Sequence, residues 1–200
     1  MKIKTIVVGD VQTNCYIIEH GGEYAVIDAG ESAAEIIASL PAPPKYIFAT
    51  HGHFDHVTAV PTLLAEYPAA KFYMHKADCV GSADTDGAGF ALFVPADEIG
   101  EINTYKDGDV FTLGGTEIRV IETPGHSKGS VTLMAENCLF SGDTLFFETC
   151  GRVDFPGGSM GEMRSSLKRL SALMGDFRVY PGHGPATTLE HERANNIYMS

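Results

Sequence analysis

The stretch Thr50-His51-Gly52-His53-Phe54-Asp55-His56 places four potential metal ligands within six residues, directly after an apolar segment. Side chains two residues apart in an extended segment point the same way, so His51 and His53 can bind one ion. The turn into the following helix directs Asp55 and His56 toward a second position. Neutral imidazole is the commonest metal ligand in proteins, and a run of histidines has no ordinary folding role. The stretch therefore predicts a loop whose side chains bind two metal ions.

Three further ligand candidates each follow an expected strand and have a glycine beside them: His126, Asp143 and His183. Glycine lets the backbone turn sharply and approach an ion, and open α/β sheets assemble their sites at strand ends. Together with the first stretch these residues make seven ligands, five histidines and two aspartates. That number exceeds what one tetrahedral ion takes and suits a dinuclear centre in which one carboxylate bridges.

The rest of the chain alternates strands and helices, and its second half repeats the pattern of the first. We expect strands at residues 2–8, 15–19, 24–28, 45–50, 71–74, 110–112, 117–121, 130–135, 138–140 and 178–180. Strands that share a chain with helices of this length predict a layered α/β fold.

Two helix starts carry the capping-box pattern, Ser32 with Glu35 and Ser159 with Glu162. A further helix is expected at about residues 56–67, and the last one from about residue 189, capped by Thr187. These helices would cover the sheets from outside.

Composition limits the class of protein. The 200 residues contain 14 Lys and Arg against 26 Asp and Glu, a net charge of −12, and 44% of them are hydrophobic. This composition predicts one folded domain over residues 1–200. The acidic surface would repel nucleic acids and anionic membranes, so we expect neither as a partner. No transmembrane run or signal peptide is evident, so we expect a cytoplasmic protein. The four cysteines are scattered, so no thiolate zinc site is expected.

The order His-x-His-x-Asp-His, then distant His, Asp and His, resembles the metallo-β-lactamase superfamily over nearly the whole chain. The resemblance implies an αββα sandwich and two divalent metal ions. Zinc is the first expectation, and iron or manganese are the alternatives. Carried over by position, it assigns His51, His53 and His126 to the first metal, Asp55, His56 and His183 to the second, and Asp143 to the bridge.

The stretch Gly151-Arg152-Val153-Asp154-Phe155-Pro156-Gly157-Gly158-Ser159 is similar to small bacterial glyoxalase II-like proteins, which are thiolester hydrolases. The resemblance implies hydrolysis of a small thiolester by a hydroxide held between the metals, with Asp55 and Asp143 as catalytic residues. Two alternatives stay open: a persulfide dioxygenase of the same superfamily with a single iron, and a non-catalytic metal-binding module.

The resemblance also argues against two activities found in the superfamily. Members that hydrolyse β-lactams commonly carry a cysteine where this chain has Asp143. Nuclease members carry a long insertion before the final histidine, and the 39 residues between Asp143 and His183 leave no room for it.

Three cationic side chains are candidates for binding an anionic substrate: Arg152, Lys128 and Lys76. Arg152 has the alternative of pairing with Asp154. Residues 81–95 predict a surface loop that could form a wall of the site.

Full-length glyoxalase II proteins continue past the final histidine into a helical domain that supplies much of the glutathione-binding surface. Only 17 residues follow His183 here. We therefore expect no C-terminal helical domain and a weaker preference for glutathione conjugates than a full-length glyoxalase II would show.

Overall fold

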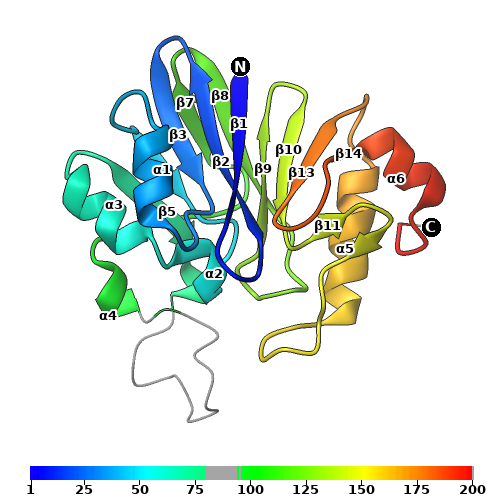
Figure 1. Cartoon of the computed structure of the whole chain (residues 1–200). Helices are drawn as coiled ribbons and strands as arrows, with labels where there is room; N and C mark the ends of the chain where they lie inside the picture. The colour runs from blue at the N-terminus through cyan, green and yellow to red at the C-terminus, as the bar shows by residue number, and fades with distance from the viewer. Residues whose placement is uncertain (80–93, 95, 200) are drawn as a thin grey trace.

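The computed structural model describes residues 1–79, 94 and 96–199 and contains two six-stranded sheets stacked face to face, with helices on their outer faces (Figure 1). The first sheet has the order β1-β2-β3-β4-β5-β6, with antiparallel pairs up to β3 and parallel pairs beyond. Its strands are β1 (Lys2–Val8), β2 (Thr13–His20), β3 (Glu23–Ile27), β4 (Tyr46–Phe48), β5 (Lys71–His75) and β6 (Ile102–Tyr105).

The second sheet has the order β14-β13-β10-β9-β8-β7, and only its β10–β13 pair is parallel. Its strands are β7 (Val110–Leu113), β8 (Thr116–Glu122), β9 (Val131–Ala135), β10 (Cys138–Gly142), β13 (Arg178–Pro181) and β14 (Thr187–Thr188). A short hairpin, β11 (Leu145–Phe146) and β12 (Thr149–Cys150), follows β10. The expected strands and the αββα sandwich are confirmed.

The helices flank the sheets, and three expectations about them were wrong in detail. They are α1 (Ala33–Ser39), α2 (Phe54–Val57), α3 (Val60–Glu66), the 3-10 turn η1 (Lys76–Asp78), α4 (Ala96–Ile99), α5 (Met160–Ser171) and α6 (Leu189–Asn195). The helix expected at residues 56–67 is split into α2 and α3, because Pro61 lacks an N–H and lies in the first turn of a new helix. Ser32 has φ 64° and makes no cap bond, whereas Ser159 does cap α5. Thr188 rather than Thr187 caps α6.

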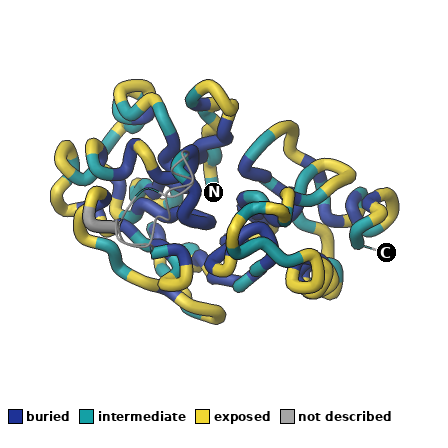
Figure 2. The backbone as a smooth tube through the Cα atoms, turned by 90° about the horizontal axis from the view of Figure 1, so that it is seen from below, coloured by how far each residue is buried: buried dark blue, intermediate teal, exposed yellow. Residues whose placement is uncertain are grey.

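The core has three layers because both faces of each sheet are covered. Along β2, Tyr16 and Ile18 point between the sheets, while Cys15 and Ile17 point toward the helices. The layer between the sheets also holds Phe48 from the first sheet and Phe140 from the second. A third cluster joins the second sheet to α5 and α6. Figure 2 shows the buried stretches of the backbone inside the molecule, with exposed stretches around them.

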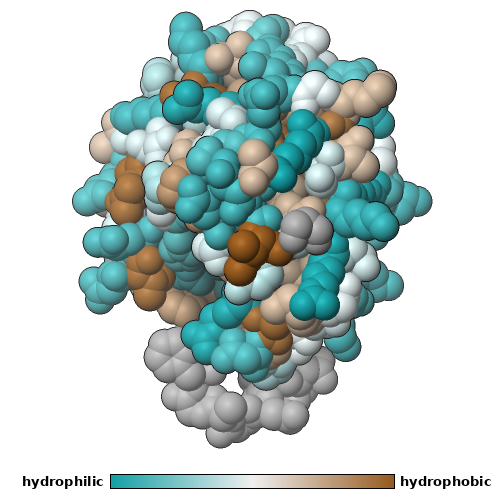
Figure 3. Space-filling model, turned by 90° about the vertical axis from the view of Figure 1, so that its right-hand side faces the viewer, coloured by the Kyte–Doolittle hydropathy of each residue, from teal (hydrophilic) through white to brown (hydrophobic). Residues whose placement is uncertain are grey.

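Figure 3 shows the side of the molecule that carries α6. This surface is mostly hydrophilic, and apolar residues are scattered over it separately. Met174 and Ile197 are among the exposed large apolar residues of the described chain. No helix within the described residues is long and apolar enough to cross a membrane. The loop expected at residues 81–95 lies outside the described residues except for Val94.

Candidate metal centre

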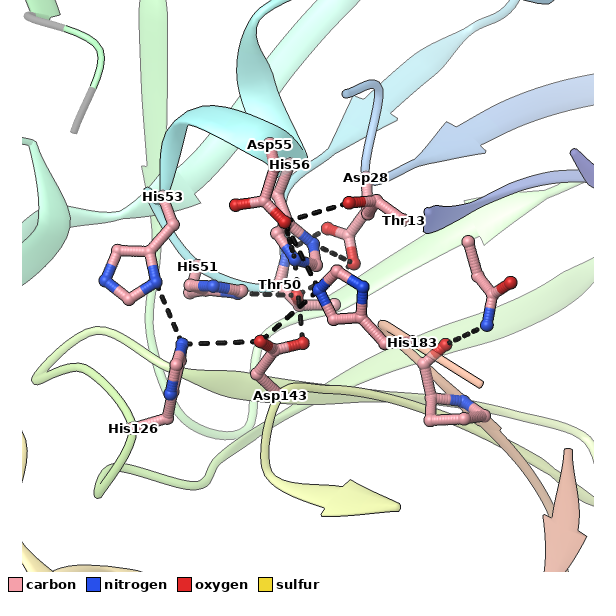
Figure 4. A network of polar contacts seen from close by, with 12 residues as sticks. Thr13, Asp28, Thr50, His51, His53, Asp55, His56, His126, Asp143 and His183 are labelled. Atoms are coloured by element: carbon pink, nitrogen blue, oxygen red, sulfur yellow. Dashed lines mark hydrogen bonds and ion pairs between the residues drawn. The ribbon is translucent and has the colours of Figure 1, made fainter. Parts of the chain in front are cut away.

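Strand ends at one edge of the sandwich bring the seven expected ligands together (Figures 1 and 4). The His51–His56 loop follows β4, His126 follows β8, Asp143 follows β10 and His183 follows β13. Since β10 and β13 are parallel neighbours, Asp143 and His183 leave the sheet at the same edge. Three overlapping groups of donor atoms result, each within 4.8 Å: His51 with His53 and His126; His51 with His56 and Asp143; and Asp55 with His56 and His183.

Close approach of the backbone explains one of the glycines beside the ligands. A Cβ atom on Gly182 would lie 2.2 Å from Asp143 Oδ1 and 2.8 Å from His56 Cε1. Only glycine therefore lets the segment before His183 pass this close to the other ligands.

Asp143 contacts histidines from both halves of the centre, as Figure 4 shows. Its Oδ2 lies 3.4 Å from His126 Nε2 and 3.6 Å from His183 Nε2, and its Oδ1 lies 3.5 Å from His56 Nε2. This central position is the one that a bridging carboxylate needs.

Asp55 belongs to the group that also contains His56 and His183, here called the second group, whereas His51, His53 and His126 form the first group. Its Oδ2 is 3.3 Å from His56 Nε2 and 3.2 Å from His183 Nε2, and it accepts a hydrogen bond from the Thr13 hydroxyl at 2.8 Å. Thr13, the first residue of β2, thereby fixes the carboxylate of a candidate ligand.

Hydrogen bonds to the far side of the imidazole rings orient their Nε2 atoms toward the centre. His126 Nδ1 donates to the carbonyl of Arg152 at 2.7 Å, and His183 Nδ1 donates to the carbonyl of Val11 at 3.2 Å. A carbonyl can only accept, so Nδ1 carries a proton in both rings, and Nε2 is the nitrogen that remains to face a metal ion. His51 Nδ1 lies 3.2 Å from the Thr50 hydroxyl, which leaves its Nε2 facing the centre.

Asp28, which is not among the ligands predicted from the sequence, contacts the second group on the side away from the cavity-lining ligands through His56. It follows β3 and accepts hydrogen bonds from the Thr50 amide at 2.7 Å and the Thr50 hydroxyl at 2.9 Å. Its Oδ2 also lies 3.0 Å from His56 Nδ1. Asp28 therefore holds the end of β4 and the His56 ring in one arrangement.

Asp78 was also missed, and it joins the two loops that carry His53 and His126. Its buried carboxylate accepts hydrogen bonds from the Gly52 amide at 3.0 Å, the Gly129 amide at 2.8 Å and the Ser127 hydroxyl at 2.6 Å. A Cβ atom on Gly129 would lie 2.5 Å from Asp78 Cγ, so glycine is needed for this contact.

We expect Asp78→Asn to weaken metal binding by about 10-fold to 100-fold, the usual effect of losing a group that orients ligands. An amide has one acceptor oxygen fewer, which leaves one of the three donors unsatisfied. The measurement is metal retention during titration with a competing chelator. Glu66→Gln, the same exchange at an exposed position of α3, is the control. Equal retention in the two variants would show that Asp78 does not orient the ligands.

The protonation states of the metal-free chain suit most of these ligands. Burial and the neighbouring imidazoles lower the pKa of His53 to about 3 and hold that of His51 well below its usual value, so both rings are neutral. Burial alone would raise the pKa of Asp55, but hydrogen bonds from His183 and other neighbours hold it well below the usual range.

His56 behaves differently because it lies between carboxylates. Burial lowers its pKa, but the charges of Asp28 and Asp143 outweigh burial and raise the pKa well above its usual value. A metal ion at this position would displace the proton, as metal binding to histidine ordinarily does.

The residues present fit a pair of divalent metal ions. His51 Nε2 and Asp143 Oδ1 are buried and have no hydrogen-bond partner among the described residues. Buried polar atoms without partners are costly, and a bound cation removes that cost. Imidazole and carboxylate donors without thiolate suit zinc, iron or manganese. The assignment of the seven ligands and the choice of metal stay predictions.

A cavity of about 670 Å³ opens above the centre. Five candidate ligands line it, together with Val11, Phe54, Phe146, Arg152, Phe155 and Pro156.

Of the three cations predicted to contact substrate, Arg152 lines the cavity. It also pairs with Asp154 through two hydrogen bonds of 2.7 and 2.6 Å, the alternative that the sequence left open. Lys76 and Lys128 are exposed, and neither is among the described residues that line the cavity. Their contact with substrate stays an untested prediction.

A family model of the metallo-beta-lactamase superfamily matches residues 8–183. The chain therefore belongs to the metallo-β-lactamase superfamily.

Two relatives extend this result. A protein of Aquifex aeolicus is 38% identical over 205 aligned residues, which cover 99% of this chain and 97% of that protein. A hydroxyacylglutathione hydrolase of Aeromonas hydrophila is 34% identical over 170 residues, which cover 84% of this chain and 59% of the longer relative.

Three solved structures are similar in fold. BLEG-1, described as a B3 metallo-beta-lactamase, superposes with a TM-score of 0.85 at 30% identity and full coverage of both chains. TTHA1623 in a di-iron-bound form gives 0.84 at 34% identity, covering 98% of this chain and 99% of that one. ETHE1 from Myxococcus xanthus gives 0.77 at 24% identity, covering 98% and 84%, and shows the fold alone.

Proposed function

We propose that this metallo-hydrolase cleaves thiolesters at a centre of two divalent metal ions. The observation that carries the proposal is that seven histidine and aspartate side chains converge in overlapping groups, and that five of them line one cavity. The eleven described residues lining the cavity include no serine or cysteine that could act as a nucleophile. A water molecule is therefore the nucleophile that the site favours.

When bound, two divalent metals would supply a Lewis acid and a water of lowered pKa. His51, His53 and His126 would hold one metal, Asp55, His56 and His183 the other, and Asp143 both. Asp55 faces the cavity as an ionised carboxylate, fixed by Thr13. From this position Asp55 can orient the attacking water or take its proton.

A thiolester suits this site because its leaving group needs little assistance. A thiol has a pKa near 8.5, so the thiolate departs without a strong general acid. The Aeromonas relative, named as a hydroxyacylglutathione hydrolase, supports the same substrate class.

Two rival reactions are compared with thiolester hydrolysis. The persulfide dioxygenase alternative would use one iron and consume oxygen, and the likeness to ETHE1 at 24% identity bears on the fold alone. The BLEG-1 neighbour makes β-lactam hydrolysis the second rival reaction. Against that reaction, Asp143 stands where many β-lactamases carry cysteine.

The test begins with purified protein of measured metal content. Separate samples are then given S-lactoyl-N-acetylcysteamine, a persulfide or nitrocefin. We expect release of free thiol from the thiolester, no oxygen uptake with the persulfide and no opening of the β-lactam. Absence of thiolester turnover by fully metallated protein would refute the proposal, and oxygen uptake would favour the dioxygenase.

A further inference from the structure

The cavity wall is apolar outside the metal centre. Of its six described residues that are not candidate ligands, five are apolar and only Arg152 carries a polar side chain. Three of the apolar five are phenylalanines, at positions 54, 146 and 155. A ligand above the centre therefore meets phenyl rings rather than hydrogen-bonding groups.

Two of these rings flank the centre on opposite sides. Phe155 lies against the first group, with its ring 5.9 Å from that of His53 and 6.5 Å from that of His126. Phe146 lies against the second group, 6.2 Å from the ring of His183. Phe155 therefore borders the cavity beside the first group, and Phe146 borders it beside the second.

Arg152 does not offset this apolar character. Its guanidinium forms two hydrogen bonds with Asp154 and lies 3.9 Å from the centroid of the Phe155 ring. Its charge is therefore compensated before any substrate arrives. The guanidinium also covers one face of the ring that forms the wall.

The second ring is held in place by a buried carboxylate. Phe146 lies on the β11–β12 hairpin, whose Glu148 amide donates to Glu192 Oε2 at 2.9 Å. Glu192 is fully buried and also accepts from the Thr187 hydroxyl at 2.7 Å. The hairpin is thus fixed to α6, and the apolar wall exists before substrate binds.

We propose that the preferred substrate is a thiolester with an apolar, aromatic acyl group rather than a hydroxyacyl group. This inference rests on the proposed thiolester hydrolysis. An aromatic acyl group stacks on Phe155 or Phe146 and removes apolar surface from water. The hydroxyl of a lactoyl group finds no side-chain partner in the described wall except a guanidinium that is already paired, and burying it without a partner is unfavourable.

The experiment compares phenylacetyl and lactoyl thiolesters of the same thiol, N-acetylcysteamine, with the holoenzyme. Each kcat/KM is divided by the rate of hydroxide-catalysed hydrolysis of the same ester, which removes differences in intrinsic reactivity. We expect the normalised value for the phenylacetyl ester to be at least about tenfold higher, the size of discrimination that an apolar pocket provides.

Variants identify the wall that the acyl group contacts. Either Phe146→Ala or Phe155→Ala should remove most of the preference, whereas the Leu variant of the same position should keep part of it. Phe147→Ala is the matched control, because Phe147 is exposed, stacks on His191 and does not line the cavity among the described residues.

The outcomes separate the two proposals. Turnover of both esters with equal values, or with a preference for lactoyl, overturns the inference and leaves thiolester hydrolysis standing. A preference that survives in both alanine variants also overturns the inference. Turnover of neither ester overturns both proposals.

Discussion

Asp143→Asn is expected to lower kcat/KM for a thiolester on the order of 10³-fold, the range seen when a main electrostatic stabiliser is removed. Asp143 contacts His126 on one side of the centre and His56 and His183 on the other. An amide keeps the size of the side chain but removes the charge shared by both groups. We expect metal content to fall along with activity, because a neutral amide is a poorer ligand for two cations.

The control for this variant is Asp107→Asn, which makes the same chemical change in a surface ion pair with Arg169 at 2.7 Å. Exposed ion pairs contribute little to stability, so this variant should keep its activity and its metals. If Asp143→Asn retained nearly full activity with two metals bound, Asp143 would not be a bridging ligand.

Removal of the metals is expected to lower Tm by on the order of 10 °C. Ions that bind only the folded chain stabilise it by about 4 kcal/mol when present at a thousand times their Kd, and for a domain of this size each kcal/mol corresponds to about 2–4 °C. The metal-free chain also keeps His51 Nε2 and Asp143 Oδ1 buried without hydrogen bonds.

Differential scanning calorimetry before and after chelation measures this shift. Restoring two equivalents of metal should restore Tm, and exposing the same protein to chelator already saturated with metal should leave Tm unchanged. An unchanged Tm after verified metal removal would contradict a centre that is integral to the fold.

The candidate ligands could be predicted from sequence because their signals are local. His51, His53, Asp55 and His56 lie in one short segment, and the strand before it fixes where that segment emerges. His126 and His183 each follow a Pro-Gly pair at the end of a strand. Such patterns identify a site without knowledge of which strands are neighbours.

The supporting residues could not be predicted, since their contacts join distant parts of the chain. Asp78 accepts hydrogen bonds from residues 26 and 51 positions away, and nothing in its own segment distinguishes it from a turn residue. Asp28 left a weak signal, because it also follows a strand at the ligand-bearing edge. The missed break between α2 and α3 had a local cause, Pro61, which the apolar periodicity of residues 56–67 obscured.

Metal analysis of the unmodified protein, purified without added metal or chelator, tests the dinuclear centre most directly. Plasma mass spectrometry normalised to protein concentration gives ions per chain. The arrangement of Asp143 between two groups of histidines predicts close to two divalent ions per chain, and a single iron with no second ion would contradict it.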